Sequence, residues 1–316
     1  MLARLQQATT LSLIALAALW AWWFGRQGEW GWACGGALLL LFGYALFLAL
    51  EFAMLSRVRG DDPAPRATAA QLLRAWWGEV VSAPRVFCWR QPFRSHAEPD
   101  HLGASHRGRL GVVFVHGFVC NRGFWNPWLA RLRAAGIPFV AVNLEPVFGR
   151  IDDYVPIVDE AVRRVREATG RAPLIVAHSM GGLAVRAWLS RSTERDAVEH
   201  VVTIGSPHHG TWLARFGVTP NGLQMRRPND WLDELQAAET ARAGASPYAN
   251  FTCFYSHCDN IVFPPSTATL PGADNRHVAG SAHVHLADQP AVFDAVWARV
   301  SPVESASNSG APATRR

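Results

Sequence analysis

The stretch Ala177-His178-Ser179-Met180-Gly181 lies between an apolar β-branched run at 174–176 and a helix-forming run at 183–189. A chain that turns sharply from a buried strand into a helix through small-x-Ser-x-Gly needs small residues on both sides of the serine, because strand and helix approach closely there. The first position is normally Gly, and Ala177 is still small. In such a nucleophile elbow the serine hydroxyl is exposed on a strained backbone. The stretch predicts an α/β architecture with Ser179 as candidate nucleophile, and an ordinary strand-to-helix turn is the alternative.

An activated serine needs a base, an acid that orients the base, and donors for the oxyanion. The strand-like run 250–256 is followed by Asp259, and an acid at the carboxyl end of a parallel strand faces the crevice where open α/β sheets place their chemistry. Asp259 is therefore the candidate orienting acid. A turn-capping role is its alternative.

Two histidines, His283 and His285, follow a small-residue turn near the end of the chain. We predict His283 as the base, with His285 as the second choice. His116 ends an earlier strand and is better explained as a turn histidine bonded to backbone. The order Ser179, Asp259, His283 is typical of α/β-hydrolases.

Backbone amides supply the predicted oxyanion site. The run Gly111 to Val115 reads as a buried strand that ends in a His-Gly turn. The amide of the residue after that turn, Phe118, and the amide of Met180 after the nucleophile are the candidate donors.

From about Leu110 to Val300 the chain resembles the bacterial lipase and esterase branch of the α/β-hydrolase family, especially members with Ala-His-Ser-Met-Gly. The resemblance implies a carboxylic ester hydrolase of the triacylglycerol lipase or carboxylesterase type that uses no cofactor. His208 and His209 lack partners at metal-ligand spacing and are expected to be loop residues, so no metal site is predicted. The matching pieces are Val115-His116-Gly117-Phe118, 177–182, Gly205-Ser206-Pro207-His208-His209-Gly210-Thr211, Asp259-Asn260-Ile261-Val262-x-Pro264, and Gly280-Ser281-Ala282-His283.

Strand and helix patterns alternate after Leu110, which predicts a mostly parallel sheet covered on both faces. No clear strand precedes Leu110, so the sheet is expected to lack the family's first two strands. The predicted strands are 112–115, 138–143, 174–177, 198–204, 251–256 and 277–279, and the predicted helices are 124–135, 153–169, 181–191, 229–242 and 291–300.

Two apolar runs precede this region. Positions 8–24 give 17 uncharged, mostly apolar residues and positions 32–50 give 19 more, each close to the ~20 residues that a helix needs to cross a bilayer. A cleaved signal peptide is the alternative for the first run. However, aromatic residues crowd its end at 20–24, as at a membrane interface, and a second run follows. The sequence predicts a hairpin of two transmembrane helices.

Arginines flank the hairpin on one side: Arg4 precedes it, and Arg57, Arg59 and Arg66 follow it, whereas the connection carries one Arg and one Glu. The positive-inside tendency places both ends, and the hydrolase region, on the cytoplasmic face of the inner membrane, with an exported or periplasmic domain as the alternative. The formal net charge of +5 favours contact with anionic lipid. The arginines are otherwise dispersed, without the aromatic-basic motif of a nucleic-acid reader.

Patterns outside the motifs complete the domain map. A helix at 68–81 has an apolar stripe with Glu79 off the stripe, and this stripe fits either the membrane surface or the catalytic core. An amphipathic helix at 229–242 is either a lid or a packed surface helix. The map comprises transmembrane helices (1–60), a linker with an amphipathic helix (61–109), the hydrolase domain (110–303) with a possible lid insertion (211–248), and a disordered tail (304–316).

The function predicted is a membrane-anchored serine ester hydrolase that acts on acyl or lipid esters through an acyl-enzyme. An acyltransferase with the same three residues is the enzymatic alternative, and a non-catalytic membrane interaction protein with the hydrolase fold is the other. The sequence leaves the natural substrate, the acyl-chain length and the oligomeric state open.

Overall fold

Five short, mainly apolar runs and one polar run form one parallel sheet. The computed structural model describes residues 1–194, 196–244 and 246–301. The strand order is β2-β1-β3-β4-β5-β6, and every neighbouring pair is parallel. The predicted α/β class is confirmed, and among the described residues no strand precedes β1. The strands are β1 (Val112–Val115), β2 (Phe139–Ala141), β3 (Leu174–His178), β4 (His200–Ile204), β5 (Phe251–Tyr255) and β6 (Asp274–His277).

Helices cover both faces of the sheet, as expected for a parallel sheet whose crossovers are helical. Alternate residues of β1 enter different cores: Val113 and Val115 pack with α7 and α8, and Val112 and Phe114 pack with α6 and α12. These helices are α6 (Asn126–Ala134), α7 (Val155–Thr169), α8 (Met180–Arg191) and α12 (Pro290–Val300), joined by the short α11 (His283–Leu286) before α12.

The last strand differs from its prediction. The sequence placed it at 277–279, but β6 begins at Asp274 and ends at His277. All four of its side chains are exposed, and β6 is one of the two edge strands and pairs only with β5. Apolar alternation marks strands that bury a face, so a polar edge strand gives no such signal.

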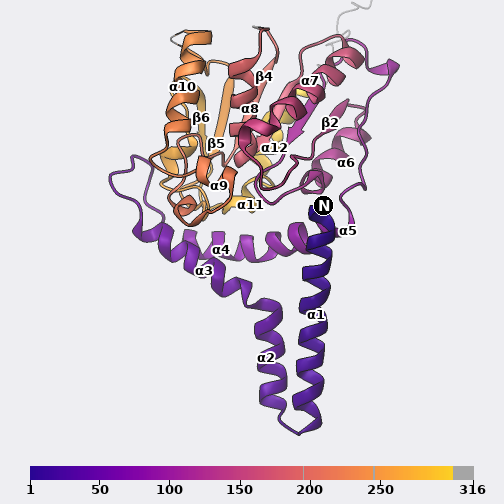
Figure 1. The fold of residues 1–316 in the computed structure, drawn as a ribbon, viewed down its shortest axis with the longest axis vertical. Coiled ribbons are helices and arrows are strands. Elements are labelled where there is room, and N and C mark those ends of the chain that lie inside the picture. Colours follow the sequence, from indigo (N-terminus) through magenta and orange to yellow (C-terminus); the bar gives the residue numbers. More distant parts are fainter. Residues whose placement is uncertain (195, 245, 302–316) are drawn as a thin grey trace, which may run out of the picture.

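The second predicted span, 32–50, is not one straight helix. The chain forms α1 (Leu2–Arg26), α2 (Trp30–Phe42) and α3 (Tyr44–Arg57), and the axes of α2 and α3 differ by 53°. The break falls at Gly43. An added Cβ there would lie 2.5 Å from the Leu39 carbonyl oxygen, so the bend needs glycine. Only α2 pairs along α1 in the projecting hairpin, and α3 turns away under the sheet domain (Figure 1).

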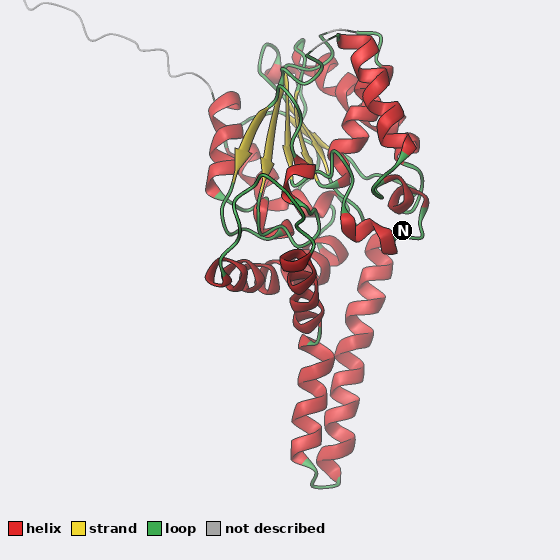
Figure 2. Ribbon diagram, turned by 90° about the vertical axis from the view of Figure 1, so that its left-hand side faces the viewer, coloured by secondary structure: helices red, strands yellow, loops and turns green. Residues whose placement is uncertain are grey.

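The hairpin projects from the edge of the sheet where the strands end. The strand arrowheads point toward the side that carries α1 and α2 (Figure 2). Helix α4 (Ala69–Pro84) begins at a Thr68–Gln71 capping box and lies across this edge, between the sheet domain and the hairpin (Figure 1). It buries Ala75, Glu79 and Ser82. The sequence predicted only that Glu79 lies off the apolar stripe of this helix, and the structure shows its carboxylate buried against the domain.

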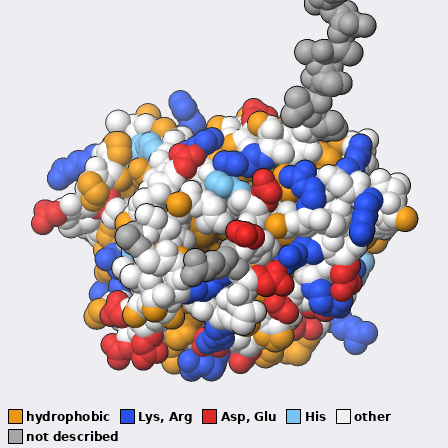
Figure 3. All heavy atoms as spheres, turned by 90° about the horizontal axis from the view of Figure 1, so that it is seen from above, with side chains coloured by type: hydrophobic (Ala, Val, Ile, Leu, Met, Phe, Trp, Pro, Cys, Tyr) orange, Lys and Arg blue, Asp and Glu red, His pale blue; other side chains and the backbone are white. Residues whose placement is uncertain are grey.

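Beyond α4, the chain forms a π-helical turn (Arg85–Arg90) and α5 (Gln91–Phe93) before it reaches β1. The opposite end of the molecule, seen from above in Figure 3, has arginines and acidic side chains interspersed over its surface. Residues 304–316, predicted to be a disordered tail, lie outside the described residues.

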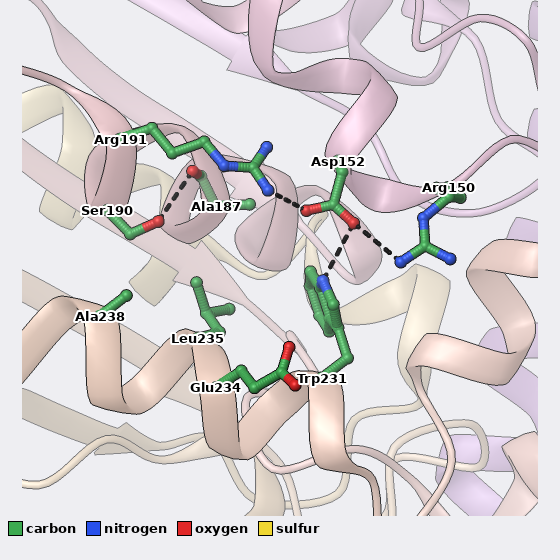
Figure 4. Close-up of a pocket in the computed structure, with 9 residues that line it drawn as sticks. All are labelled: Arg150, Asp152, Ala187, Ser190, Arg191, Trp231, Glu234, Leu235 and Ala238. Atoms are coloured by element: carbon green, nitrogen blue, oxygen red, sulfur yellow. Dashed lines mark hydrogen bonds and ion pairs between the residues drawn. The ribbon is translucent and has the colours of Figure 1, made fainter.

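The insertion between β4 and β5 has two parts. A 3₁₀ turn (Trp212–Phe216) and α9 (Pro220–Gln224) lie low in Figure 1, near α11, whereas α10 (Asp230–Ala243) rises along the flank of the sheet. Helix α10 packs against α8. The Glu239 carboxylate of α10 accepts from Arg186 Nε at 2.9 Å and Nη2 at 2.7 Å. At the other end of α10, Trp231 Nε1 donates to Asp152 at 3.0 Å, in a pocket of about 390 Å³ lined also by Arg150 and Arg191 (Figure 4).

We expect Glu239→Gln to lower the melting temperature of the full chain, because it leaves a buried guanidinium without its counter-charge. The Arg186 side chain is 1% exposed. Removing one partner of such a pair costs about 3 kcal/mol or more, which thermal unfolding followed by circular dichroism measures. The control is Glu160→Gln, which breaks an exposed pair with Arg163. An equal loss of stability in both variants would contradict the importance of the buried pair.

Candidate active site

Ser179 occupies a strained turn between β3 and α8. Its backbone has φ 55° and ψ −132°, a region that residues other than glycine rarely adopt. In the described chain, only Ser179 and Val119 among non-glycine residues have positive φ. The Ser179 amide donates to the Ile204 carbonyl at 2.9 Å, which ties the turn to β4. Strain of this kind persists only where surrounding contacts hold it, and it gathers at functional sites.

Close backbone approaches explain the small residues around this turn. A Cβ on Gly181 would lie 2.6 Å from the His116 carbonyl oxygen, and a Cβ on Gly117 would lie 2.7 Å from the Ser179 Cβ. The loop after β1 and the turn after β3 therefore touch.

The two candidate oxyanion donors lie on these touching segments. Met180 is the first residue of α8, so its amide has no carbonyl partner within the helix. Phe118 precedes Val119, whose φ is 52°. In the loops and turns that the structure describes, no backbone carbonyl accepts from either amide. Both N–H groups are thus available to a ligand beside Ser179.

His283 and Asp259 form a buried hydrogen-bonded pair. The His283 Nδ1 atom lies 3.0 Å and 2.9 Å from the two carboxylate oxygens of Asp259, and the residues are 5% and 1% exposed. The Asp259 Oδ1 atom also accepts from the amides of Ile261 at 2.9 Å and Val262 at 2.8 Å. The Asp259 carboxylate is thus fixed from two directions, and it fixes the orientation of the imidazole.

Ser179 and His283 lie at the same edge of the sheet. The ring of His178, next to Ser179, is 4.7 Å from the ring of His283, and His178 Nε2 is 3.2 Å from the His283 carbonyl oxygen. The described hydrogen bonds include none between the Ser179 hydroxyl and His283. Such contacts are often long before a substrate binds.

Electrostatics favour the charged form of this imidazole. Burial alone lowers the pKa of His283, but the negative charge of Asp259, followed by Glu79 and Glu51, raises it above the ordinary histidine value. A higher pKa makes His283 a stronger proton acceptor and stabilises the imidazolium that forms when a serine is deprotonated.

The other histidines have different surroundings. His285, the second choice for the base, has Nε2 3.0 Å from Gln289 Nε2 and its ring against Gly78 of α4. His116 accepts from the Leu144 amide at 3.0 Å, and burial lowers its pKa to about 4, so it is neutral. His208 Nε2 lies 3.0 Å from the Thr203 hydroxyl. No three His, Cys, Asp or Glu residues gather at metal-ligand spacing in residues 1–194, 196–244 and 246–301.

Sequence reasoning missed three polar side chains beside His283. Glu79 of α4, Glu51 of α3 and Asn260 are 2%, 4% and 0% exposed. Asn260 belongs to the Asp-Asn-Ile-Val motif, but no role followed from that motif. Glu51 directly follows the apolar run 32–50, and nothing local to either glutamate indicates burial.

Comparison with known proteins supports the same architecture. Residues 112–305 match a family model described as "Alpha/beta hydrolase family". The lipase BlEst2 of Bacillus licheniformis in its mature form superimposes with a TM-score of 0.53 at 17% identity, over 62% of this chain and 93% of that one. Lipase B of Aspergillus fumigatus superimposes with a TM-score of 0.51 at 19% identity, over 63% of this chain and 55% of that one. No curated protein matches the sequence. At these identities, the superpositions establish the fold alone.

We expect Gly205→Ala to disrupt the His283–Asp259 pair. Gly205 has φ 55°, and an added Cβ would lie 2.9 Å from Asp259 Oδ2 and 3.2 Å from His283 Nδ1. The matched control is Gly272→Ala, where φ is 76° and no atom lies within 4 Å of the added Cβ. Both variants carry the strain of a left-handed backbone, about 1 kcal/mol or more.

Only Gly205→Ala should also lose ester hydrolysis, by at least about 10²-fold, since small misplacements of reacting groups cost this much. Initial rates with a short chromogenic ester measure the difference. Equal activity in the two variants at equal folded fraction would count against a role for the pair.

Proposed function

The chain belongs to the alpha/beta hydrolase family, and from that premise we propose that it is a serine ester hydrolase of the lipase or carboxylesterase type. The observation that carries the proposal is the convergence of a strained serine, a buried His–Asp pair and two free amides at one edge of the sheet. Each is a group that acyl transfer through a serine requires.

In the proposed reaction, the Ser179 hydroxyl oxygen attacks the acyl carbonyl carbon while His283 Nε2 takes the hydroxyl proton. Asp259 holds the imidazole through Nδ1 and stabilises its positive charge. The amides of Phe118 and Met180 donate to the oxyanion of the tetrahedral intermediate. The imidazolium then gives its proton to the leaving alkoxide, and water repeats the sequence on the acyl-enzyme. The scheme uses no cofactor.

A lipid or other apolar acyl ester is the proposed substrate class. Exposed apolar side chains lie on loops at the strand-end side of the sheet: the Phe118 ring is 6.0 Å from the Phe148 ring, and Phe148 is 40% exposed. Helix α9 joins this group, since Asn221 Nδ2 donates to the Val147 carbonyl at 2.9 Å. The neighbouring Phe216 and Val218 are 64% and 84% exposed. Such a rim suits an acyl chain, and it makes the 212–224 part of the insertion the better lid candidate than α10.

The proposed location is a membrane surface. Helix α1 is 25 residues long and apolar enough to span a bilayer, although a signal sequence passes the same test. Its length of about 37 Å exceeds the ~30 Å hydrocarbon core. Leu73 and Trp77 of α4 are 64% and 61% exposed, and α4 lies between the sheet domain and the hairpin (Figure 1). In this arrangement the strand-end edge that carries Ser179 faces the lipid. Membrane lipids are then both the support and the substrate reservoir.

We expect a fluorophosphonate probe to label the full-length protein, because the activated Ser179 hydroxyl attacks phosphorus as it attacks an acyl carbon. Ser179→Ala should abolish labelling, and Ser281→Ala, a buried serine near His283 in sequence, should retain it. In-gel fluorescence measures both. An unlabelled wild-type protein of native fold would refute the proposed function. A hydrolysis series over esters of increasing chain length, with competing alcohols present, then separates lipase, carboxylesterase and acyltransferase.

We expect both termini of the chain to lie in the cytoplasm, since the arginines near the hairpin are on that side. Fusions to a reporter that is active only after export should be inactive at either end. The same reporter inserted at Gly28, the hairpin turn, should be active. Active fusions at the termini would instead favour an exported domain.

A further inference from the structure

We propose that Glu79 and Glu51, carried by the N-terminal helices α4 and α3, are positioning residues for His283, so that the segment before the hydrolase region completes the active site. The inference rests on the proposed function. It goes beyond the family match, because that match begins at residue 112 and contains neither glutamate.

Glu79 binds the backbone amides of the two residues that follow His283. Its Oε1 accepts from the Val284 amide at 3.0 Å, and its Oε2 accepts from the His285 amide at 3.1 Å. Both carboxylate oxygens are thereby engaged by α11, the short helix on which His283 is the first residue. The side chain is almost fully buried, so solvent cannot replace these bonds.

Glu51 acts through Asn260. The Asn260 Nδ2 atom donates to Glu51 Oε2 at 2.6 Å, and Asn260 Oδ1 accepts from the His283 amide at 3.2 Å. The Glu51 carboxylate thus fixes the orientation of the Asn260 side-chain amide. The oxygen of that amide accepts the hydrogen bond from the backbone N–H of His283. Three successive amides, from 283 to 285, are held by side chains. Two of them bond Glu79 of α4 directly, and the third bonds Asn260, which Glu51 of α3 orients.

Close packing makes this contact stiff. A Cβ on Gly78 would lie 2.4 Å from His285 Nδ1, so α4 and α11 meet without space for a side chain at that point. On the α3 side, Phe52 and Leu55 pack with Ala75, Phe263 and Ala282 in one buried apolar cluster. The two glutamates therefore belong to a packed interface between the N-terminal helices and the loops after β5 and β6.

Charge adds to geometry. The ionisable groups that face His283 are Asp259, Glu79, Glu51 and the neutral His178. Those that face Glu79 are His283, Asp259 and Glu51, and those that face Glu51 are Glu79, His283 and Asp259. Burial raises the pKa of each glutamate to about 7. Each ionised carboxylate favours the imidazolium form of His283, and its removal lowers the pKa of the imidazole.

The test measures the pKa of His283 by NMR titration of histidine-labelled full-length protein in detergent, with the signal assigned from a His283→Asn sample. The comparison uses Glu51→Gln, Glu79→Gln and Glu79→Asp. The control is Glu29→Gln, an exposed glutamate at the start of α2 in the same N-terminal segment.

The glutamine at 51 can still accept from Asn260, so that variant removes charge with little change of contacts. The glutamine at 79 places an amide N–H against a backbone N–H and removes both charge and contact.

We expect the wild-type imidazole to titrate above 6.5, and the pKa to fall by about half a unit or more in both glutamine variants. The acid limb of kcat/KM should move to lower pH by the same amount, because the protonated imidazole cannot accept a proton and the limb reports its pKa. In Glu79→Asp the acid limb of kcat/KM should keep its wild-type pH, because the carboxylate charge is retained. The kcat should fall several-fold at unchanged KM, because the shorter side chain binds the amides of Val284 and His285 less well. The control should match wild type in both measurements.

An unchanged His283 pKa in Glu51→Gln would overturn the proposal. If Glu79→Gln does not fold, the result with Glu51→Gln alone decides. The titration needs no catalysis. If the wild-type protein hydrolyses no ester but the pKa shifts appear, the proposed function fails while the positioning of His283 holds.

Discussion

A buried imidazole hydrogen-bonded to a buried carboxylate is the contact on which the proposed site depends. Burial of a charged or polar group is costly unless its hydrogen-bonding atoms find partners. The hydrogen-bonding partners of His283 and Asp259 include the amides of Ile261 and Val262, the side chain of Asn260 and the ring of His178. Glu79 adds to them by binding the amide of Val284, directly after His283. Gly205 is required beside this pair because any side chain there would occupy its space. The loops after β3, β4, β5 and β6 are thus positioned by one polar network.

This network gives the N-terminal helices a second role. An apolar hairpin could support a domain through any flexible linker, yet here α3 and α4 pack directly on the strand-end edge and place two carboxylates beside His283. The bend at Gly43 makes this possible, because it directs α3 away from α1 and under the sheet. Attachment to the membrane and orientation of the imidazole would then depend on the same short stretch of chain.

Local sequence patterns predicted much of the fold. The strand-turn-helix pattern around Ser179 and the runs before Asp259 and His283 predicted elements that the structure contains, because buried parallel strands are apolar throughout and end at the same edge. His283 rather than His285 pairs with Asp259, as the turn spacing indicated.

What the sequence did not indicate depends on contacts between distant segments. Glu79 precedes Val284 by 205 positions. Helical periodicity placed it only off the apolar stripe, because periodicity cannot distinguish a solvated carboxylate from one that binds buried amides. The apolar run 32–50 gave no sign of its break, since a glycine within an apolar helix is common in membrane helices. The edge strand β6 lacked any apolar face to recognise.

The most direct test of the account is an experimental structure of the full-length protein after reaction with a fluorophosphonate. The account predicts phosphorus bonded to the Ser179 oxygen, a phosphoryl oxygen about 3 Å from the amides of Phe118 and Met180, and His283 still paired with Asp259. An adduct on another residue, or one whose phosphoryl oxygen points away from both amides, would contradict it.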